Sequence, residues 1–275
     1  MSIEVTLLGT GSPIPNPDRA GPSTLVRAGD SLLLIDCGRG VVMRLAGSGV
    51  VPVQLTAVLL THLHSDHITD LNDIVTTHWV MTQGPTPLAV YGPPGTQRVV
   101  NAVMEMLALD QQYRHDHHED LKHPPMVNVT EVVPGDSFAV GKTRVSVHQT
   151  DHRPVAPTVG YRIEHEGAVA AIAGDTIPCD TLDAMCKDAD LYVQTVIRDD
   201  LVRLVPNARL QDILDYHSSV TQAAQTAARC GVKKLVMTHY VPPIQPGQED
   251  SWKAIAAAHF DGEIILGNDL TKAVS

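Results

Sequence analysis

Short apolar segments and longer amphipathic ones alternate along the chain. Segments rich in Val, Ile and Leu and bounded by Gly, Pro or Asp predict strands, because branched side chains suit a pleated, half-buried surface. The later strands are interleaved with helical segments, whereas the first ones follow each other as in hairpins, so we expect a mixed α/β sandwich rather than a doubly wound parallel sheet. The predicted strands are Ile3–Leu8, Thr24–Arg27, Leu32–Ile35, Ala57–Leu60, Leu88–Tyr91, Thr143–His148, Val159–Ile163, Ala168–Ala173, Leu191–Val193, Leu235–Thr238 and Ile264–Leu266.

Helices are predicted between several of these strands. The helix at Val220–Cys230 has the clearest boundaries, since Ser218 or Ser219 can cap its first amides and Gly231 can supply a left-handed stop. Its alanine-rich body favours helix as well. The other helices are predicted from about Val41 to Gly47–Gly49, and at Asp66–Trp79, Thr96–Leu109 and Ser251–His259.

Neither a repeat of fixed period nor a Pro- and Gly-rich linker divides the 275 residues, so we expect a single domain over residues 1–275. The chain has no tract of about 18 apolar residues that could span a membrane. The opening sequence MSIEVTLLGTGSP lacks the pattern of a secretory signal. We therefore expect a cytoplasmic protein with no membrane partner.

The charge balance bears on possible partners. The chain has 31 acidic against 20 basic residues, a formal net charge of −11, which disfavours an extended nucleic-acid-binding face. Five arginines could form a local basic patch, but scattered surface positions are the default expectation for them: Arg19, Arg27, Arg198, Arg203 and Arg209. The four cysteines form no CxxC pair and are expected to be reduced: Cys37, Cys179, Cys186 and Cys230.

Histidine is unusually frequent, with 14 residues against 2 Phe and 2 Trp. Histidine is the commonest metal ligand in proteins, so each histidine has to be considered as a possible ligand. The segment Asp110–Pro125 holds four of them, His115, His117, His118 and His123, without a clean period. We interpret that segment as a solvated surface loop rather than a third metal site.

A run of seven residues, Thr-His-Leu-His-Ser-Asp-His, directly follows the apolar strand Ala57–Leu60. Alternate residues of an extended segment point to the same side, so His62 and His64 can face one metal ion. Asp66 and His67 fall at the start of the next predicted helix, where they can face a second ion. The spacing therefore predicts a site for two metal ions.

Two metal ions need more ligands than this run supplies, and a strand followed by a candidate ligand recurs along the chain. His152, Asp175 and His239 each come shortly after a predicted strand, and strand ends are where open α/β folds place ligand sites. His148 competes with His152 because it ends the same strand. Asp36 also follows an apolar strand and could be read as a ligand.

On these motifs the chain resembles the ribonuclease Z family of metallo-β-lactamase-fold hydrolases, endonucleases that mature the 3′ end of transfer RNA. The resemblance implies an αββα sandwich, with two mixed sheets packed face to face and helices outside. The matching segments extend over nearly the whole chain: Leu8-Gly9-Thr10-Gly11-Ser12, Ile35-Asp36-Cys37-Gly38, the run from His62 to His67, Tyr91-Gly92-Pro93-Pro94-Gly95, His152 with Gly160-Tyr161-Arg162, Gly174-Asp175-Thr176, His217-Ser218-Ser219 and Thr238-His239-Tyr240.

The resemblance implies two zinc ions and assigns their ligands. It favours His152 over His148, because Gly160-Tyr161-Arg162 follows downstream, and it makes Asp36 a carboxylate that orients ligands rather than binding the ion. The implied ligands are His62, His64 and His152 for one ion and Asp66, His67 and His239 for the other, with Asp175 bridging.

The family also implies a mechanism. Two zinc ions activate water for in-line attack on phosphorus and stabilise charge on the phosphoryl oxygens. Asp66 is the expected residue that orients the attacking water and takes its proton, and His217 is the expected general acid at the leaving oxygen. Family members commonly dimerise, so a homodimer is implied too.

The chain departs from the family pattern at two places. The family's His-Glu-Ala-Thr segment, whose Glu orients the general acid, is replaced by Val193-Gln194-Thr195-Val196, which has no carboxylate. Many members also insert a long arm that grips transfer RNA between the third histidine ligand and the bridging aspartate. Only residues 153–174 lie there in this chain, enough for a β-hairpin, so the arm is absent at that position.

These features order the expected functions. The leading expectation is a dinuclear zinc phosphodiesterase that removes the 3′ trailer of precursor transfer RNA. The missing arm and the acidic charge motivate an alternative, a small-substrate hydrolase on the same fold such as a cyclic-nucleotide phosphodiesterase or an arylsulfatase. A metal-stabilised binding module without catalysis is disfavoured because every ligand is present, and β-lactam hydrolysis because Asp66 and the His217 segment fit the phosphodiesterase branch better.

Overall fold

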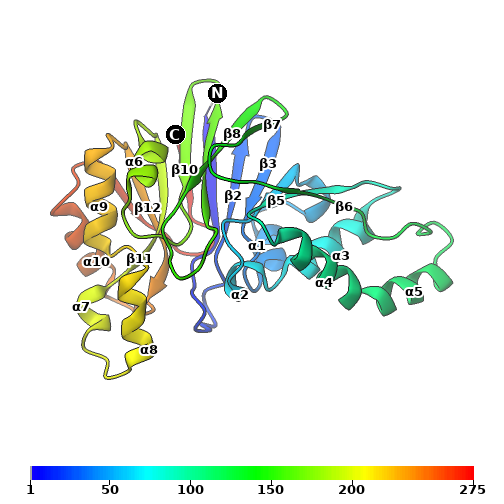
Figure 1. Cartoon of the computed structure of the whole chain (residues 1–275), viewed down its shortest axis with the longest axis horizontal. Coiled ribbons are helices and arrows are strands. Elements are labelled where there is room, and N and C mark those ends of the chain that lie inside the picture. The colour runs from blue at the N-terminus through cyan, green and yellow to red at the C-terminus, as the bar shows by residue number, and fades with distance from the viewer. Residues whose placement is uncertain (1) are drawn as a thin grey trace.

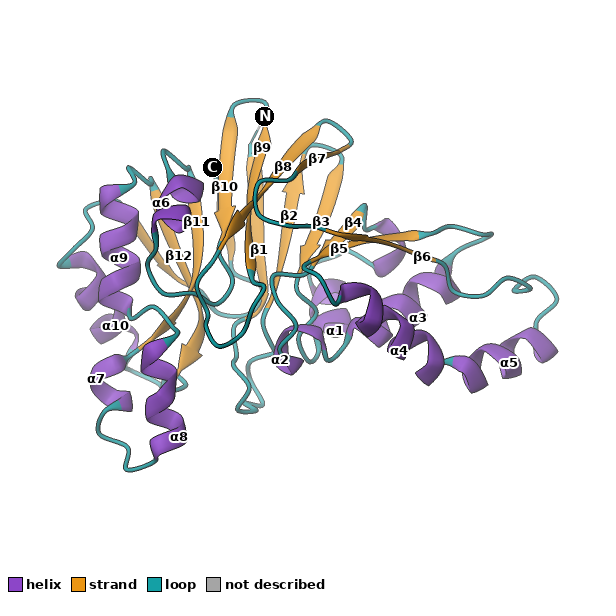
Figure 2. Ribbon diagram, viewed as in Figure 1, coloured by secondary structure: helices purple, strands orange, loops and turns teal. Residues whose placement is uncertain are grey.

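Two seven-stranded mixed sheets pack face to face in the computed structural model, which describes residues 2–275, and helices cover the outer side of each sheet (Figures 1 and 2). This arrangement confirms the expected αββα sandwich. Among the described residues, no helix has the length and apolar character that crossing a membrane requires.

The first sheet combines an antiparallel and a parallel half. Its strand order is β14-β1-β2-β3-β4-β5-β6, antiparallel from β14 to β3 and parallel from β3 onward. The strands are β1 (Ile3–Gly9), β2 (Ser23–Ala28), β3 (Ser31–Ile35), β4 (Ala57–Leu59), β5 (Leu88–Gly92), β6 (Val127–Glu131) and β14 (Lys272–Val274).

The second sheet has the same mixed character. Its order is β13-β12-β11-β10-β9-β8-β7, in which β7 to β10 form an antiparallel meander and β10 to β13 run parallel. The hairpin of β9 and β10 occupies the interval between His152 and Asp175, as expected for a chain without the arm. The strands are β7 (Ser137–Val140), β8 (Thr143–Gln149), β9 (Val159–His165), β10 (Ala168–Ile172), β11 (Leu191–Ile197), β12 (Lys234–Val241) and β13 (Glu263–Leu266).

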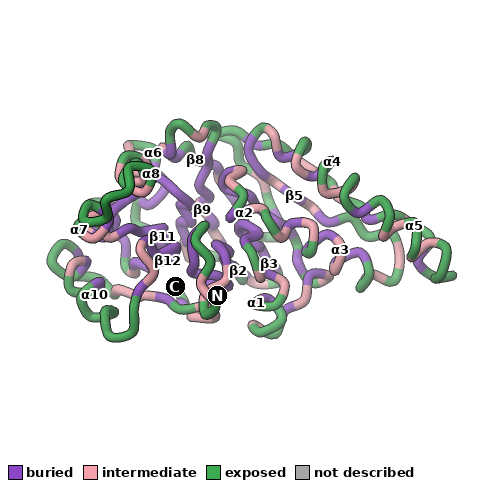
Figure 3. Tube along the Cα trace, turned by 90° about the horizontal axis from the view of Figure 1, so that it is seen from below, coloured by how far each residue is buried: buried purple, intermediate pink, exposed green. Residues whose placement is uncertain are grey.

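Three apolar layers hold the sandwich together. Alternate strand residues such as Leu7, Tyr161 and Val193 fill the space between the sheets. The opposite strand faces pack beneath the helices, for instance Tyr192 of β11 in the second sheet. Because most strands are buried on both faces, they are nearly continuous in apolar residues, which is why they could be read from the sequence. Figure 3 shows the buried strands between exposed outer helices.

Helices α1, α3 and α4 cover the first sheet, and α6, α9 and α10 cover the second (Figure 1). Helix α9 begins as predicted: the Ser219 hydroxyl accepts a bond from the Gln222 amide, and the Gln222 side chain accepts one from the Ser219 amide. The α-helices are α1 (Val41–Gly47), α2 (Ser65–Ile68), α3 (Leu71–Met81), α4 (Thr96–Met106), α5 (Ala108–His117), α6 (Asp180–Cys186), α7 (Asp199–Val202), α8 (Ala208–Gln211), α9 (Val220–Arg229) and α10 (Glu249–Ala257), with 3-10 turns η1 (Pro52–Gln54) and η2 (Asp212–Asp215).

Two predicted elements differ from the structure. The predicted helix Asp66–Trp79 is two helices, α2 and α3, because the Asp70 carboxylate accepts a bond from the Gly40 amide and its backbone leaves the helical conformation. The predicted loop Asp110–Pro125 is wrong in its first half, where α5 extends to His117. Helix α5 has no buried residue, so it lacks an apolar period, and it is stabilised by side-chain pairs such as Arg114 with Asp110.

Several short elements were not predicted from the sequence: the strands β6, β7 and β14 and the helices α6, α7 and α8. All four cysteines are free thiols, three of them buried and Cys179 half-buried, in agreement with the expected reduced state.

Candidate metal centre

The candidate ligands lie where strands end, at one edge of the sandwich. His62 and His64 follow β4, His152 follows β8, and Asp175 follows β10. His239 lies near the end of β12 in a left-handed conformation, with φ of 54°. Such a backbone is uncommon outside glycine, and strained residues of this kind cluster at functional sites.

Contacts between the two sheets bring these strand ends together. The Tyr161 hydroxyl donates to the Leu60 carbonyl at 2.6 Å, and the Val159 amide donates to the Thr61 carbonyl at 2.9 Å. Gly174 approaches the same segment, since a Cβ built on it would lie 2.8 Å from Thr61 and its φ is +66°. Only glycine permits this approach, so the close packing holds the residue after Gly174 next to the histidine run.

Four donor atoms surround one point in the first ligand group. His64 Nδ1 lies 3.1 Å from His62 Nε2 and 3.3 Å from His152 Nε2. Asp175 Oδ2 lies 3.8 Å from both of those Nε2 atoms. Zinc–ligand bonds of about 2.0–2.2 Å in a tetrahedron set donor separations of roughly 3.3–3.6 Å, so these spacings fit a zinc-sized ion.

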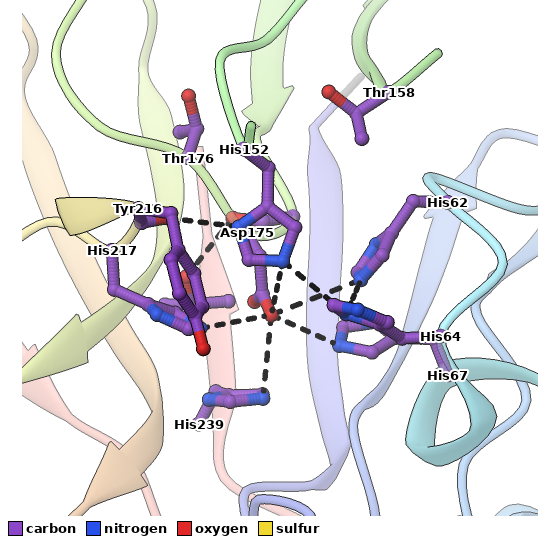
Figure 4. Close-up of polar contacts among 12 residues, drawn as sticks. His62, His64, His67, His152, Thr158, Asp175, Thr176, Tyr216, His217 and His239 are labelled. Carbon is purple, nitrogen blue, oxygen red and sulfur yellow. Dashed lines mark hydrogen bonds and ion pairs between the residues drawn. The ribbon is translucent and has the colours of Figure 1, made fainter. Parts of the chain in front are cut away.

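The second group shares Asp175 with the first. Asp66 Oδ2 lies 3.6 Å from His67 Nε2 and 3.3 Å from His239 Nε2. Asp175 Oδ2 lies 3.4 Å from His67 Nε2 and 3.6 Å from His239 Nε2. One carboxylate oxygen therefore faces both groups, and Figure 4 shows the imidazoles converging on it.

Burial and charge keep His62, His152 and Asp175 in the forms that bind cations. Burial lowers the pKa of His62, and it lowers the pKa of His152 to about 4, so both imidazoles are neutral. Burial alone would raise the pKa of Asp175, but the neighbouring His239 and His67 hold it well below its usual value. His67 Nε2 is buried without a hydrogen bond to any of residues 2–275. A cation facing that nitrogen would satisfy it.

A second layer of contacts fixes the rings. The Asp36 carboxylate bonds His67 Nδ1 at 2.8 Å and the Thr61 hydroxyl at 2.8 Å, and that hydroxyl lies 3.0 Å from His62 Nδ1. His152 Nδ1 bonds the Tyr216 carbonyl at 2.8 Å. Asp36 thus contacts His67 through Nδ1, the nitrogen that faces away from the metal centre, and it is not itself one of the converging donors. This is the orienting position expected for it.

The structure brings together all seven candidate ligands and leaves His148 out. His148 Nε2 lies 3.4 Å from the Ser146 hydroxyl of its own strand and belongs to neither group. The seven that converge are His62, His64, Asp66, His67, His152, Asp175 and His239.

His217 lies beside the shared carboxylate. Its Nε2 is 3.2 Å from Asp175 Oδ2, and its Nδ1 is 3.1 Å from the Ile213 carbonyl oxygen. Gln194, at the position of the family's Glu, bonds elsewhere: its Oε1 accepts from the Tyr192 hydroxyl and its Nε2 donates to the Thr195 carbonyl. A backbone carbonyl, which no sequence motif marks, therefore orients His217.

A cavity of about 510 Å³ opens over the centre, and the sequence analysis did not predict it. Its floor includes Asp66 and Asp175, and its sides come from two segments far apart in the chain. One is the loop at residues 12–14, and the other runs from Asn207 in front of α8 to Tyr216.

The five arginines considered for a basic patch do not gather at this centre. Arg198 pairs with Asp200 at 2.7 Å, and Arg203 pairs with Asp199 at 3.9 Å. Arg209 alone among the arginines and lysines of residues 2–275 lines the cavity.

Comparison with known proteins places this geometry in a family. Residues 32–240 match the model of the beta-lactamase superfamily domain. Ribonuclease Z of Mycobacterium bovis (strain BCG / Pasteur 1173P2) is 56% identical over 270 residues, covering 98% of this chain and 96% of that protein. Ribonuclease Z of Mycobacterium marinum is 56% identical as well, covering 98% of this chain and 97% of the relative.

Two solved structures share the fold along the whole chain. The metallo-beta-lactamase fold protein YhfI from Bacillus subtilis superposes with a TM-score of 0.78 at 21% identity, covering 100% of this chain and 99% of that one. The short form of human tRNase Z superposes with a TM-score of 0.71 at 25% identity, covering 98% of each chain.

Proposed function

The chain belongs to the ribonuclease Z family of the beta-lactamase superfamily, and on that premise we propose that it is a zinc-dependent endonuclease that removes the 3′ trailer of precursor transfer RNA. The observation that carries the proposal is the placement of His217 Nε2 3.2 Å from Asp175 Oδ2, the oxygen that faces donor atoms of both ligand groups. An acid for the leaving oxygen thus stands beside the place where two cations would hold a phosphodiester.

Each cation has a defined set of ligands in this proposal. The first would be held by His62, His64 and His152 and the second by Asp66, His67 and His239, with Asp175 placed to contact both. When bound, two zinc ions supply Lewis acidity toward the phosphoryl oxygens and activate the attacking water. Nitrogen and carboxylate donors suit zinc, and elemental analysis of purified protein is expected to give two zinc ions per chain.

Two residues carry the proton transfers. Burial alone would raise the pKa of Asp66, but its hydrogen bond to His239 and the charges of His67 and His239 together lower that pKa, so Asp66 stays ionised and can orient water and accept its proton. His217 holds a proton at Nε2 for the leaving oxygen, while the Ile213 carbonyl holds Nδ1 and fixes the plane of the ring.

The acidic composition is compatible with an RNA substrate. The net charge of −11 disfavours a broad electrostatic face, but cations at the centre would supply positive charge where the scissile phosphate lies.

Cleavage of a precursor transcript by the zinc-loaded protein tests the proposal. We expect cleavage to be lost after zinc removal and in Asp66→Ala. Hydrolysis of bis(p-nitrophenyl) phosphate by the same preparation, with the transcript left intact, would remove the RNA assignment and leave the diesterase class.

We further propose a cytoplasmic homodimer whose residues 1–275 fold as a single domain. Met106 at the end of α4 and Leu109 and Tyr113 of α5 are large apolar side chains that are exposed. Large exposed apolar side chains that gather on one surface are typical of a subunit interface. Light scattering is expected to show a dimer, and Leu109→Asp is expected to dissociate it. Calorimetry is expected to show a single unfolding transition, as for one domain. Cell fractionation is expected to place the protein in the cytoplasm.

A further inference from the structure

The cavity over the metal centre carries one unpaired cation at its edge. We propose that Arg209 binds the phosphate next to the scissile one, with the nucleoside between the two phosphates held in the cavity. The inference rests on the proposed function, because it deepens the substrate class of that site from a phosphodiester to a nucleotide unit of an RNA strand.

The cavity walls suit a planar ring and not a second phosphate. Ile14, 59% exposed, comes from the loop on one side, while Leu210 and Ile213 come from α8 and η2 on the other. The ring of Tyr216 lies against those of His152 and His217, with centroids 5.1 and 4.8 Å apart. A volume of about 510 Å³ with mostly apolar walls is typical of a site for one small ligand.

Arg209 is available for an anion. Its side chain is exposed and makes no hydrogen bond or ion pair with any of residues 2–275. Its neighbours Arg198 and Arg203, by contrast, are paired with Asp200 and Asp199. A guanidinium without a carboxylate partner is well suited to bind a phosphate through two parallel hydrogen bonds.

The backbone beneath Arg209 is held in place. The Asn207 side chain caps α8 by accepting a bond from the Leu210 amide at 3.2 Å, and the Gln211 side chain donates to the Val205 carbonyl at 2.9 Å. Leu210 and Ile213 pack against a small apolar cluster formed by Ile197, Val202 and Val241. Arg209 therefore projects from a fixed turn beside the cavity.

The ligand class follows from these positions. The scissile phosphate would lie at the shared Asp175, and Arg209 lines the same cavity, whose other walls are largely apolar. A single phosphodiester such as a cyclic nucleotide can contact the metal centre but has no second phosphate for Arg209. A nucleotide with phosphates on both sides of its sugar can contact the metal centre and Arg209 together, so Arg209 favours an RNA strand over an isolated diester.

Isothermal titration of the zinc-loaded protein tests this without relying on activity. The probes are adenosine 3′,5′-bisphosphate, adenosine 3′-monophosphate and adenosine 5′-monophosphate. We expect the bisphosphate to bind about tenfold more tightly than either monophosphate, as one charge-assisted contact provides. Arg209→Gln should remove this difference, leaving the bisphosphate within about twofold of the tighter monophosphate.

Arg203→Gln is the matched control, since it removes an exposed arginine of the same segment that does not line the cavity. It should preserve the tenfold difference. The proposal is overturned if the wild-type protein does not prefer the bisphosphate, if Arg209→Gln weakens all three ligands equally, or if Arg203→Gln acts as Arg209→Gln does. Failure of the proposed function would appear separately, as an uncleaved precursor transcript with the titration results unchanged.

Discussion

His217 Nδ1 lies 3.1 Å from the carbonyl oxygen of Ile213, four residues earlier in the chain. The contact fixes the imidazole plane and turns Nε2 toward Asp175. It does so with a main-chain acceptor in a family whose usual orienting group is a carboxylate. Because the same turn, η2, also lines the cavity, it connects the orientation of His217 to the binding of substrate.

Restoring a carboxylate at the family position should therefore bring no gain. Gln194 is fully buried, and its amide nitrogen donates to the Thr195 carbonyl, so Gln194→Glu would bury a charge against a carbonyl oxygen. We expect a loss of about 2–4 kcal/mol in the free energy of unfolding and no rise in kcat. Urea denaturation and steady-state kinetics measure the two quantities. A variant with increased kcat would show that the Ile213 carbonyl does not do the orienting.

Removing the imidazole of His217 should affect chemistry and not metal content. His217→Ala is expected to lower kcat by on the order of 10²–10⁴-fold with little change in KM, as for loss of a general acid. The zinc content should stay at two per chain. His148→Ala is the control, since His148 lies outside both ligand groups, and it should leave kcat and zinc content unchanged. Loss of one zinc ion in His217→Ala would instead make His217 a ligand.

Asp36 should control metal affinity through the rings that it holds. Asp36→Asn weakens the contacts to His67 Nδ1 and the Thr61 hydroxyl, and loss of such outer contacts typically costs about 10–100-fold in metal affinity. Competition with a chromophoric chelator measures this affinity. Asp30→Asn, at an exposed position, should have no effect. Equal zinc affinity in Asp36→Asn and wild type would contradict the orienting role.

The N-terminal cap of α9, two residues after His217, offers a test of local stability. Ser219→Ala removes the acceptor for the Gln222 amide and is expected to cost about 1 kcal/mol of unfolding free energy. Thermal denaturation of the zinc-loaded protein gives the measurement, and Ser137→Ala, which removes an exposed hydroxyl of β7, provides a comparison. A cost near zero would mean that solvent replaces the cap.

The sequence predicted the site better than it predicted the elements around it. The ligands could be found because each follows an apolar strand, and buried strands have a strong signal. Helix α5 could not, because its stabilising pair of Arg114 and Asp110 creates no apolar period. The break between α2 and α3 at Asp70 depends on a hydrogen bond from the Gly40 amide, 30 residues away. A contact at that distance in the chain cannot be predicted from the local pattern of apolar residues.

Two parts of the site depend on contacts that cannot be predicted from the residue types in the sequence. The Ile213 carbonyl acts through its position, and any residue there could supply it. The cavity arises where the loop at residues 12–14 meets the segment at 207–216, segments that the chain order separates by almost 200 residues. Only the folded structure shows that Arg209 lies at this junction.

The most direct test of the account is the mapping of products from one precursor transfer RNA incubated with the zinc-loaded protein. We expect a single cut at the boundary between the mature sequence and its 3′ trailer, absent in Asp66→Ala and after zinc removal. An intact transcript, under conditions in which the same protein hydrolyses bis(p-nitrophenyl) phosphate, would contradict the assignment.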